Sequence, residues 1–150
     1  MDRESFDCAY RGGFVGAEHH FALTVYFEDT DAYRVVYYAN YLKFMERARS
    51  DMIRAVGVDQ AAELRRSGSA YAVVEVGIKY RRPARLGDDL LVVSTVQQVR
   101  ASSVDIHQRV MRGPELMTDA RVTAAFLDGS GRPQRQPKDW VEKFMAIITK

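Results

Sequence analysis

Three carboxylates stand within the five residues 28–32 of this 150-residue chain: Glu28, Asp29 and Asp31. An ionised carboxylate can attack a carbonyl carbon, accept a proton from water or bind a hard metal ion. No matching carboxylate cluster recurs downstream, which disfavours a metal site. Asp side chains commonly bond to nearby backbone N–H groups, so we expect Glu28 and Asp29 to order the loop.

Two segments of different periodicity flank these residues. Apolar residues alternate with other residues over Phe21–Glu28, which predicts a half-buried strand. Apolar residues recur every three or four positions from Tyr41 to Val56, which predicts an amphipathic helix ending near Gly57. The carboxylates therefore lie beside the N-terminus of a helix, whose unpaired N–H groups can polarise a carbonyl group or bind an anion.

The remaining chain predicts two short helices and a run of strands. Asp59 is a typical N-cap for a helix that ends at Gly68, and another helix follows Pro137. Between them lie four alternating or apolar stretches, at residues 72–80, 90–96, 103–110 and 119–126. The connections between these stretches, including Pro83–Asp89, have lengths that suit antiparallel neighbours.

This order of elements predicts an α+β fold, with one antiparallel sheet covered on one face by the long helix. We expect a single domain over residues 21–150, preceded by an N-terminal extension over residues 1–20. A sheet covered on one face leaves strand edges and apolar surface available, so we also expect two copies to associate.

The composition narrows the class of protein. Apolar residues make up 47% of the chain and charged residues 28%, and a net charge of +2 is too small to argue for nucleic acid. No apolar run approaches the roughly 20 residues that cross a bilayer, and residues 1–20 lack the apolar region of a signal peptide. A single cysteine, Cys8, excludes an intrachain disulfide. We expect a cytoplasmic protein without a nucleic-acid partner or a membrane span.

The histidines indicate no other chemistry. His19 and His20 precede the first predicted strand, and His107 lies in an outward-facing strand phase. None has a partner at the spacing of a zinc site, so we expect all three at the surface. The G-x-S-x-G pattern of serine hydrolases is also missing from the sequence.

Two longer stretches closely resemble one family. The block VYFEDTDA at residues 25–32, with VVYYANY and FMERAR after it, resembles the hotdog-fold acyl-CoA thioesterases. The nearest branch contains 4-hydroxybenzoyl-CoA thioesterase and the Tol-Pal-associated (YbgC-like) thioesterases. The segment IKYRRPARLGD at residues 78–88 resembles a second motif of that family, and the resemblance covers residues 21–128. It implies a hotdog fold, in which an antiparallel sheet wraps around a long central helix.

The resemblance also implies an activity and its residues. Acyl-CoA would be hydrolysed without a metal or redox cofactor, and acyl carrier protein remains an alternative thiol carrier. Asp31 would be catalytic, either as the nucleophile that forms an acyl-enzyme anhydride or as the base that activates water. The backbone N–H of Tyr38 would polarise the carbonyl group. Substrate contacts would involve Arg34, Val36, Tyr37, Lys79, Arg82, Arg85 and Arg100.

The chain departs from the family pattern at Tyr33–Arg34, where relatives carry a small residue followed by glycine, which permits positive φ. Arg34 would narrow the acyl pocket, change the loop path or supply a cation to the substrate. The resemblance further implies a homodimer, or a homotetramer of paired dimers, with active sites between protomers. A non-catalytic acyl-CoA-binding or envelope-assembly module of the same fold is the alternative function. A hotdog dehydratase is disfavoured because the long-helix region contains no histidine.

Overall fold

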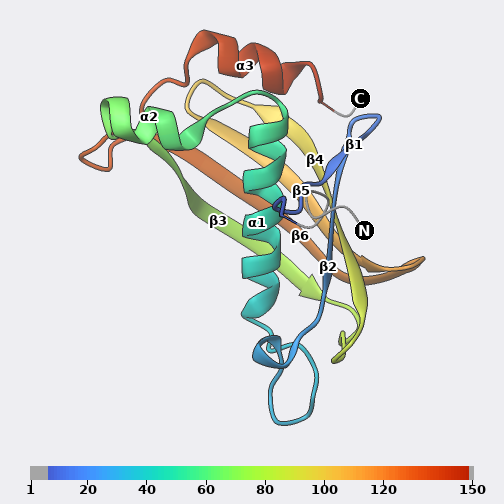
Figure 1. The fold of residues 1–150 in the computed structure, drawn as a ribbon. Coiled ribbons are helices and arrows are strands. Elements are labelled where there is room, and N and C mark those ends of the chain that lie inside the picture. Colours follow the sequence, from blue (N-terminus) through green and yellow to red (C-terminus); the bar gives the residue numbers. More distant parts are fainter. Residues whose placement is uncertain (1–6, 149–150) are drawn as a thin grey trace.

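A computed structural model describes residues 7–148 of the chain. One antiparallel sheet has the strand order β1-β2-β4-β5-β6-β3 (Figure 1). Its strands are β1 (Gly13–Val15), β2 (Glu18–Thr24), β3 (Ala70–Tyr80), β4 (Asp89–Val99), β5 (Ser103–Arg112) and β6 (Glu115–Leu127). The helices are α1 (Asn40–Ala55), α2 (Gln60–Ser67) and α3 (Lys138–Met145), with a 3-10 turn over Phe27–Asp29. The predicted α+β fold is confirmed.

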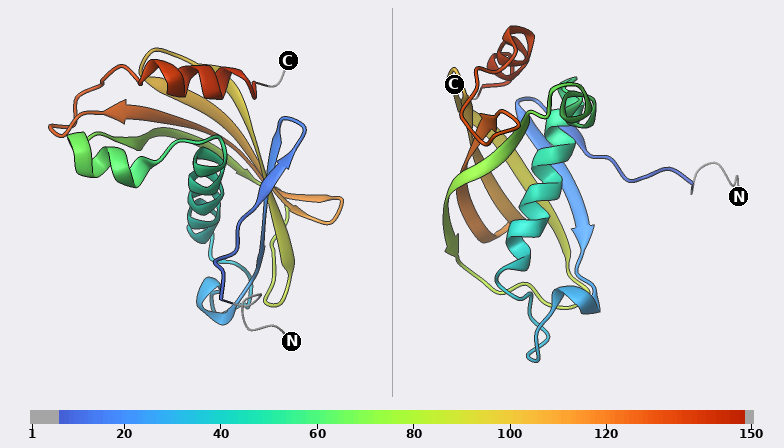
Figure 2. Two further views of the ribbon diagram at one scale, coloured as in Figure 1. Left: turned by 45° about the horizontal axis from the view of Figure 1, so that its top comes forward. Right: turned by 90° about the vertical axis from the view of Figure 1, so that its left-hand side faces the viewer.

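The sheet curves around α1, which lies along its concave face (Figure 2). One face of α1 is buried against the strands, at Tyr41, Phe44, Met45, Ala48, Arg49, Met52 and Ile53. These positions follow the three- and four-residue spacing in the sequence, and the predicted long helix is confirmed. The helix ends because Gly57 takes a left-handed φ of 95°, a conformation that glycine adopts at little cost.

The boundaries of α2 follow from its terminal residues, as predicted. The Asp59 carboxylate accepts a hydrogen bond from the Ala62 amide at 3.0 Å, which satisfies one of the unpaired N–H groups of the first turn. Gly68 ends the helix with a φ of 76°, and its amide donates to the Leu64 carbonyl. Local chemistry thus fixes both ends of this helix.

The first strand differs from its prediction. It covers Glu18–Thr24 rather than residues 21–28, and β1 precedes it within the predicted N-terminal extension. The Asp29 carboxylate accepts a hydrogen bond from the Tyr26 amide at 2.9 Å, which turns the chain out of the sheet. The prediction that His19 lies at the surface is wrong: His19 is fully buried on β2, and its Nε2 lies 2.8 Å from the Asp51 carboxylate.

The connection between β3 and β4 also corrects the sequence prediction. These strands are not neighbours, because β3 pairs with β6 at the edge of the sheet and β4 lies between β2 and β5. Residues 81–88 cross the end of the sheet instead, and the Val36 amide donates to the Ala84 carbonyl at 2.8 Å. The crossing segment therefore lies against the loop that follows the acidic residues.

The opposite end of the core is closed by α3, the predicted terminal helix (Figure 2). Trp140 and Phe144 are buried there with Phe126, and Tyr71 packs against the same rings at centroid distances of 5.2 to 6.3 Å. No helix within residues 7–148 is long and apolar enough to cross a membrane.

Candidate active site

The Asp31 loop is a tight excursion between the 3-10 turn and α1. Thr30 and Val36 form an isolated antiparallel bridge at its base. The Asp31 amide donates to the Val35 carbonyl, and the Arg34 amide donates to the Asp31 carbonyl, both at 3.0 Å. Asp31 and Tyr38 therefore belong to two arms of one loop, residues 29–31 and residues 35–38.

One oxygen of the Asp31 carboxylate stabilises this loop. Oδ1 accepts a hydrogen bond from the Tyr33 amide at 2.8 Å, in the manner of an Asx turn. Within residues 7–148, no hydrogen bond or ion pair involves the second oxygen, Oδ2. The carboxylate is therefore oriented through one oxygen, while the other can contact a ligand.

The start of α1 leaves a backbone donor available. The N-cap residue, Ala39, has no side chain that could bond to the first turn. Among the hydrogen bonds of the described residues, none uses the Tyr38 amide. The Tyr38 carbonyl accepts a bond from the Tyr80 hydroxyl at 3.2 Å, which ties this turn to the end of β3. An unpaired N–H group at a helix N-terminus can stabilise developing negative charge on oxygen.

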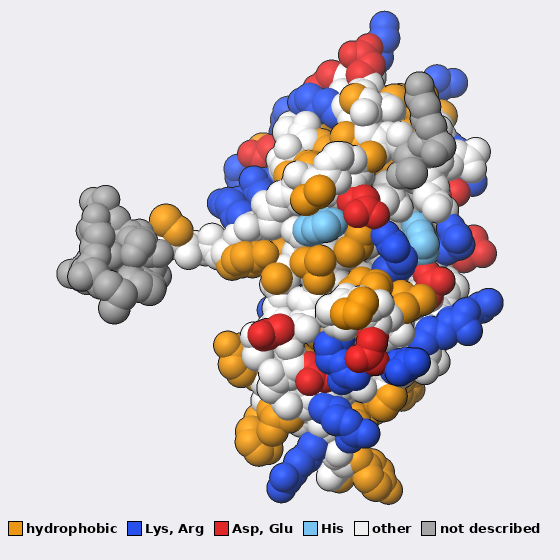
Figure 3. Space-filling view, turned by 90° about the vertical axis from the view of Figure 1, so that its right-hand side faces the viewer, with side chains coloured by type: hydrophobic (Ala, Val, Ile, Leu, Met, Phe, Trp, Pro, Cys, Tyr) orange, Lys and Arg blue, Asp and Glu red, His pale blue; other side chains and the backbone are white. Residues whose placement is uncertain are grey.

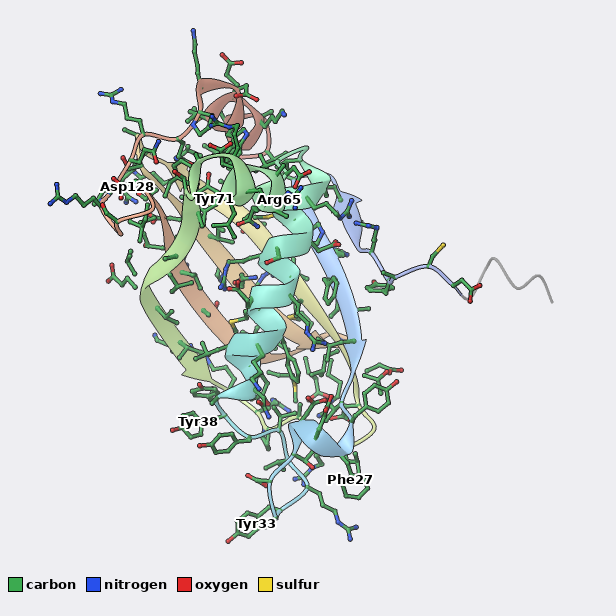
Figure 4. All side chains as sticks on the ribbon, turned by 60° about the vertical axis from the view of Figure 1, so that its left-hand side comes forward. Phe27, Tyr33, Tyr38, Arg65, Tyr71 and Asp128 are labelled. Atoms are coloured by element: carbon green, nitrogen blue, oxygen red, sulfur yellow. The ribbon has the colours of Figure 1, made fainter. Side chains whose placement is uncertain are left out.

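Asp31 and Tyr38 line the same pocket, whose volume is about 330 Å³. The loop before α1, the first turn of the helix, the end of β3 and the crossing segment all contribute to it, and Figure 4 shows Tyr38 just before α1. The lining consists of Asp31, Val35, Val36, Tyr38, Tyr41, Tyr80, Arg81, Arg82 and Pro83. The structure thus brings together four of the predicted site residues: Asp31, Val36, Tyr38 and Arg82.

Tyrosine rings form much of the apolar wall. Tyr80 lies 5.6 Å from Tyr41 and 6.2 Å from Tyr38, measured between ring centroids. Burial raises the pKa of Tyr41, and burial together with Tyr38 and Tyr41 raises the pKa of Tyr80. Both hydroxyls therefore stay protonated at neutral pH. The Tyr41 hydroxyl also accepts a bond from the Ala84 amide at 3.0 Å, which fastens the crossing segment to α1.

Arg34 and Tyr37 lie outside this lining. Arg34 is exposed and takes a φ of 62°, and its carbonyl accepts a bond from the Leu86 amide at 3.1 Å. The loop therefore keeps the left-handed conformation that glycine would adopt more easily. The exposed Tyr37 ring packs against Tyr38 at 4.9 Å, and a hydrogen bond with Tyr38 raises the pKa of Tyr37.

Three predicted basic contacts are also outside the pocket. Lys79 on β3 lines a separate hollow with Asp119 and Arg121, and Arg85 is exposed in the crossing segment. Arg100 lies beyond the far end of β4, in a bidentate pair with Asp105 at 2.7 and 2.8 Å. Arg100 follows the last residue of β4, so the eleven residues of this strand, roughly 37 Å long at about 3.4 Å per residue, separate it from the Asp31 end of the sheet.

The other two carboxylates of the acidic cluster face a different hollow. Glu28 and Asp29 line a space of about 420 Å³ on the β2 side of α1, together with Lys43 and Arg47. Asp29 uses its carboxylate to cap the 3-10 turn, which agrees with the expected loop-ordering role. Within the described part of the chain, no group of three or more His, Cys, Asp or Glu residues could hold a metal ion.

Sequence reasoning does not identify Tyr41 or Tyr80 as pocket residues, and it places Arg81 only within a basic segment, residues 79–85, that could bind the coenzyme A phosphates. Tyr80 and Arg81 lie in the second family-like motif, whose crossing path over the end of the sheet brings them to Asp31. Tyr41 was assigned to the packing face of the helix, and it is indeed buried there. The second motif thus contains pocket residues, but the predicted pairing of β3 with β4 does not bring that motif to Asp31.

Comparison with known proteins agrees with this geometry. Residues 33–118 match the family described as "Thioesterase superfamily". The chain is 38% identical over 120 residues to the acyl-CoA thioesterase YbgC of Haemophilus influenzae, covering 79% of this chain and 88% of that protein. It is 36% identical over 122 residues to the acyl-CoA thioester hydrolase YbgC of Escherichia coli O6:H1, covering 80% and 90%.

A solved structure shows the same similarity. The crystal structure of a probable thioesterase from Bartonella henselae superposes with a TM-score of 0.76 at 29% sequence identity. The match covers 80% of this chain and 99% of that one. The predicted hotdog fold is thereby confirmed.

Proposed function

Because the chain belongs to the thioesterase superfamily, a family of thioester hydrolases, we propose that it hydrolyses acyl-CoA to a free acid and coenzyme A through Asp31. One observation carries the assignment of the site. Asp31 and Tyr38 line one pocket, and no hydrogen bond within residues 7–148 uses the Tyr38 amide, so a thioester carbonyl bound there could meet both the carboxylate and the amide. A carboxylate supplies the nucleophile or base, and the amide supplies the donor for the oxyanion.

Thioester hydrolysis requires little acid assistance, because the coenzyme A thiolate is a good leaving group. If Asp31 attacks, its oxygen bonds to the acyl carbon, the carbon–sulfur bond breaks, and water then hydrolyses the resulting anhydride. If Asp31 acts as a base, it takes a proton from the attacking water and returns it to the departing thiolate. In both routes the Tyr38 amide stabilises negative charge on the carbonyl oxygen. Turnover in ¹⁸O water with recovery of label in Asp31 would identify the nucleophilic route.

We infer that the coenzyme A phosphates are bound at the mouth of this pocket and by a neighbouring protomer. Arg81 and Arg82 line the pocket, and the exposed Arg82 side chain forms an ion pair with the half-buried Glu115 at 3.1 Å. Guanidinium groups suit phosphate oxygens. Arg100 is too distant to serve the same substrate within one chain, so any contribution from it would come from a partner.

Association through β3 would supply that partner. β3 is a long strand at the sheet edge, and its Val73, Val74 and Val76 side chains are 42%, 59% and 39% exposed. Apolar side chains on an open edge favour pairing with a second strand. We propose a homodimer through this edge, and dimers that pair into a homotetramer. Light scattering should give a dimer or tetramer for the wild type and a smaller species for Val74→Lys. A stable, active wild-type monomer would refute the proposal.

Coenzyme A is the proposed thiol carrier, and acyl carrier protein is the alternative to be tested beside it. The proposed location is the cytoplasm. The decisive experiment measures thiol release from acyl-CoA and acyl-carrier-protein substrates of increasing chain length, for the purified wild type and Asp31→Asn. Turnover by the wild type alone supports the proposal. Binding of acyl-CoA without turnover by either protein would favour the non-catalytic module.

A further inference from the structure

Asn40, the first residue of α1, donates a hydrogen bond from its side-chain amide to the arm of the Asp31 loop formed by residues 29–31. Its Nδ2 lies 2.9 Å from the carbonyl oxygen of Asp29, and the Tyr37 amide donates to the same oxygen at 3.0 Å. The Asn40 backbone amide donates to the Tyr37 carbonyl at 2.8 Å. Asn40 therefore links the arm that carries Asp31 to the arm that carries Tyr38.

This link differs from an ordinary helix cap. A capping side chain accepts hydrogen bonds from N–H groups of the first turn, whereas Asn40 donates outward to a loop carbonyl. Across residues 7–148, it is the only side-chain hydrogen bond that joins residues 29–31 to α1. The other connections between the two arms run through backbone groups, at the Thr30–Val36 bridge, between Asp31 and Val35, and between Tyr37 and Asp29.

The tip of the loop has little packing of its own that could replace the link. Ala32, Tyr33 and Arg34 at its tip are exposed, and Arg34 takes a positive φ. Small changes in geometry are costly in catalysis, since a misplacement of about 1 Å can reduce the rate by about 100-fold. A bond at the base of the loop is therefore well placed to control the separation of the Asp31 carboxylate and the Tyr38 amide.

We propose that Asn40 is a positioning residue for hydrolysis, which holds Asp31 and Tyr38 at the separation that the reaction requires. The inference rests on the proposed function of Asp31 and goes beyond it, because Asn40 lies outside the lining of the Asp31 pocket. Its effect should fall on kcat rather than KM, since the substrate meets the same surfaces while the reacting groups lose their alignment.

The test compares Asn40→Ala with a matched loss of a hydrogen bond elsewhere. Asp59→Ala removes the bond from the Ala62 amide at the start of α2, away from the pocket. We expect Asn40→Ala to lower kcat about tenfold and to change KM less than twofold. Asp59→Ala should lower the melting temperature by at least as much and leave kcat unchanged. Asn40→Gln, which keeps an amide donor, should recover part of the lost kcat and also serves if the alanine variant does not fold.

Each outcome has a definite meaning. A kcat for Asn40→Ala within twofold of the wild type, with Asp31→Asn inactive, would overturn the role of Asn40 and leave the proposed function intact. A change confined to KM, or an equal loss of kcat in Asp59→Ala, would also overturn it. Undiminished hydrolysis by Asp31→Asn would instead reject the proposed function on which the inference rests.

Discussion

Aromatic side chains are buried at one end of the sheet and exposed at the other. At the α3 end, the rings of Phe126, Trp140 and Phe144 are buried against one another. At the Asp31 end, Phe27 and Tyr33 are 72% and 83% exposed, and Figure 4 shows Phe27 at the 3-10 turn and Tyr33 on the loop beyond it. The lower end of the molecule in Figure 3 accordingly shows hydrophobic and basic side chains together. One end closes the core, whereas the other leaves groups free to meet a ligand or a partner.

A buried polar layer separates the two parts of the core. The Arg49 guanidinium donates to Gln108 at 2.8 Å, and the Gln108 amide donates to Ser94 at 2.9 Å and to the Met45 carbonyl at 3.0 Å. The hydrophobic clusters lie on either side of this layer, one toward Asp31 and one toward α3. The difference between the ends therefore predicts that substitutions at the closed end reduce stability, while substitutions at the open end reduce activity.

The largest effect should come from Asp31→Asn, because an amide is neither a carboxylate nucleophile nor a competent base. We expect kcat to fall by roughly 1000-fold or more, with little change in unfolding free energy. Asp29→Asn is the matched control, since the new side chain keeps an oxygen that can accept the Tyr26 bond. Kinetics with urea denaturation would test the pair, and equal losses of kcat would contradict the separate roles of the two residues.

At the closed end, Phe144→Ala should have the opposite profile. Phe144 is 1% exposed, and truncating such a ring in a core costs about 3 to 5 kcal/mol. We expect this loss in the unfolding free energy, while kcat per folded molecule stays within about twofold of the wild type. Measurement at a temperature well below the transition keeps the variant folded. A large loss of kcat in folded protein would show that the two ends are coupled.

A smaller effect should appear in the pH dependence of stability, through His19. Burial lowers the pKa of His19, although the hydrogen bond with Asp51 opposes this change and Arg54 and His20 add to it. The unfolded chain therefore binds a proton at a higher pH than the folded protein does. Stability should fall as pH drops below about 6.5, until the folded pKa is reached.

His19→Asn removes the titrating ring and tests this assignment. The variant should show a weaker loss of stability than the wild type between about pH 6.5 and 5.5, measured by urea midpoints in matched buffers. The same slope in both proteins would mean that other groups dominate the acid response. The Asp51 carboxylate also accepts a hydrogen bond from the Gly12 amide at 2.9 Å. We therefore expect acid unfolding to begin in the hairpin of β1 and β2.

The sequence predicted the elements whose signals are local. The spacing of apolar residues predicted α1, and Asp59 with Gly68 predicted both ends of α2. Three of the predicted strand stretches show alternation of apolar and other residues, and the stretch at residues 90–96 is a continuous apolar run that is largely buried on β4. Asp31 is predicted as a site residue because a long motif surrounds it, and the structure places it in a pocket with Tyr38.

Features that depend on distant partners could not be predicted in this way. His19 is buried because Asp51, on α1, supplies its hydrogen bond. The connection after β3 has the length of a hairpin link, yet the strand pairs with β6 because the following residues bond to the Asp31 loop. This strand order determines which basic side chains lie at the pocket. Arg81 lines the pocket, whereas Arg100 pairs with Asp105 outside it.

The smallest effect should come from Arg34→Gly, at the tip of the open end. A non-glycine residue in the left-handed region, as Arg34 is, costs about 1 to 2 kcal/mol of stability, which glycine would recover. Glycine also has more conformational freedom in the unfolded chain, and this opposing effect costs roughly 0.5 to 1 kcal/mol. We expect a net stabilisation of about 0.5 kcal/mol. Because Arg34 lies outside the pocket lining, the ratio of kcat/KM between long and short acyl-CoAs should stay constant. A selective gain for long chains would place the side chain in the acyl path, and a uniform rise in KM would make it a coenzyme A contact.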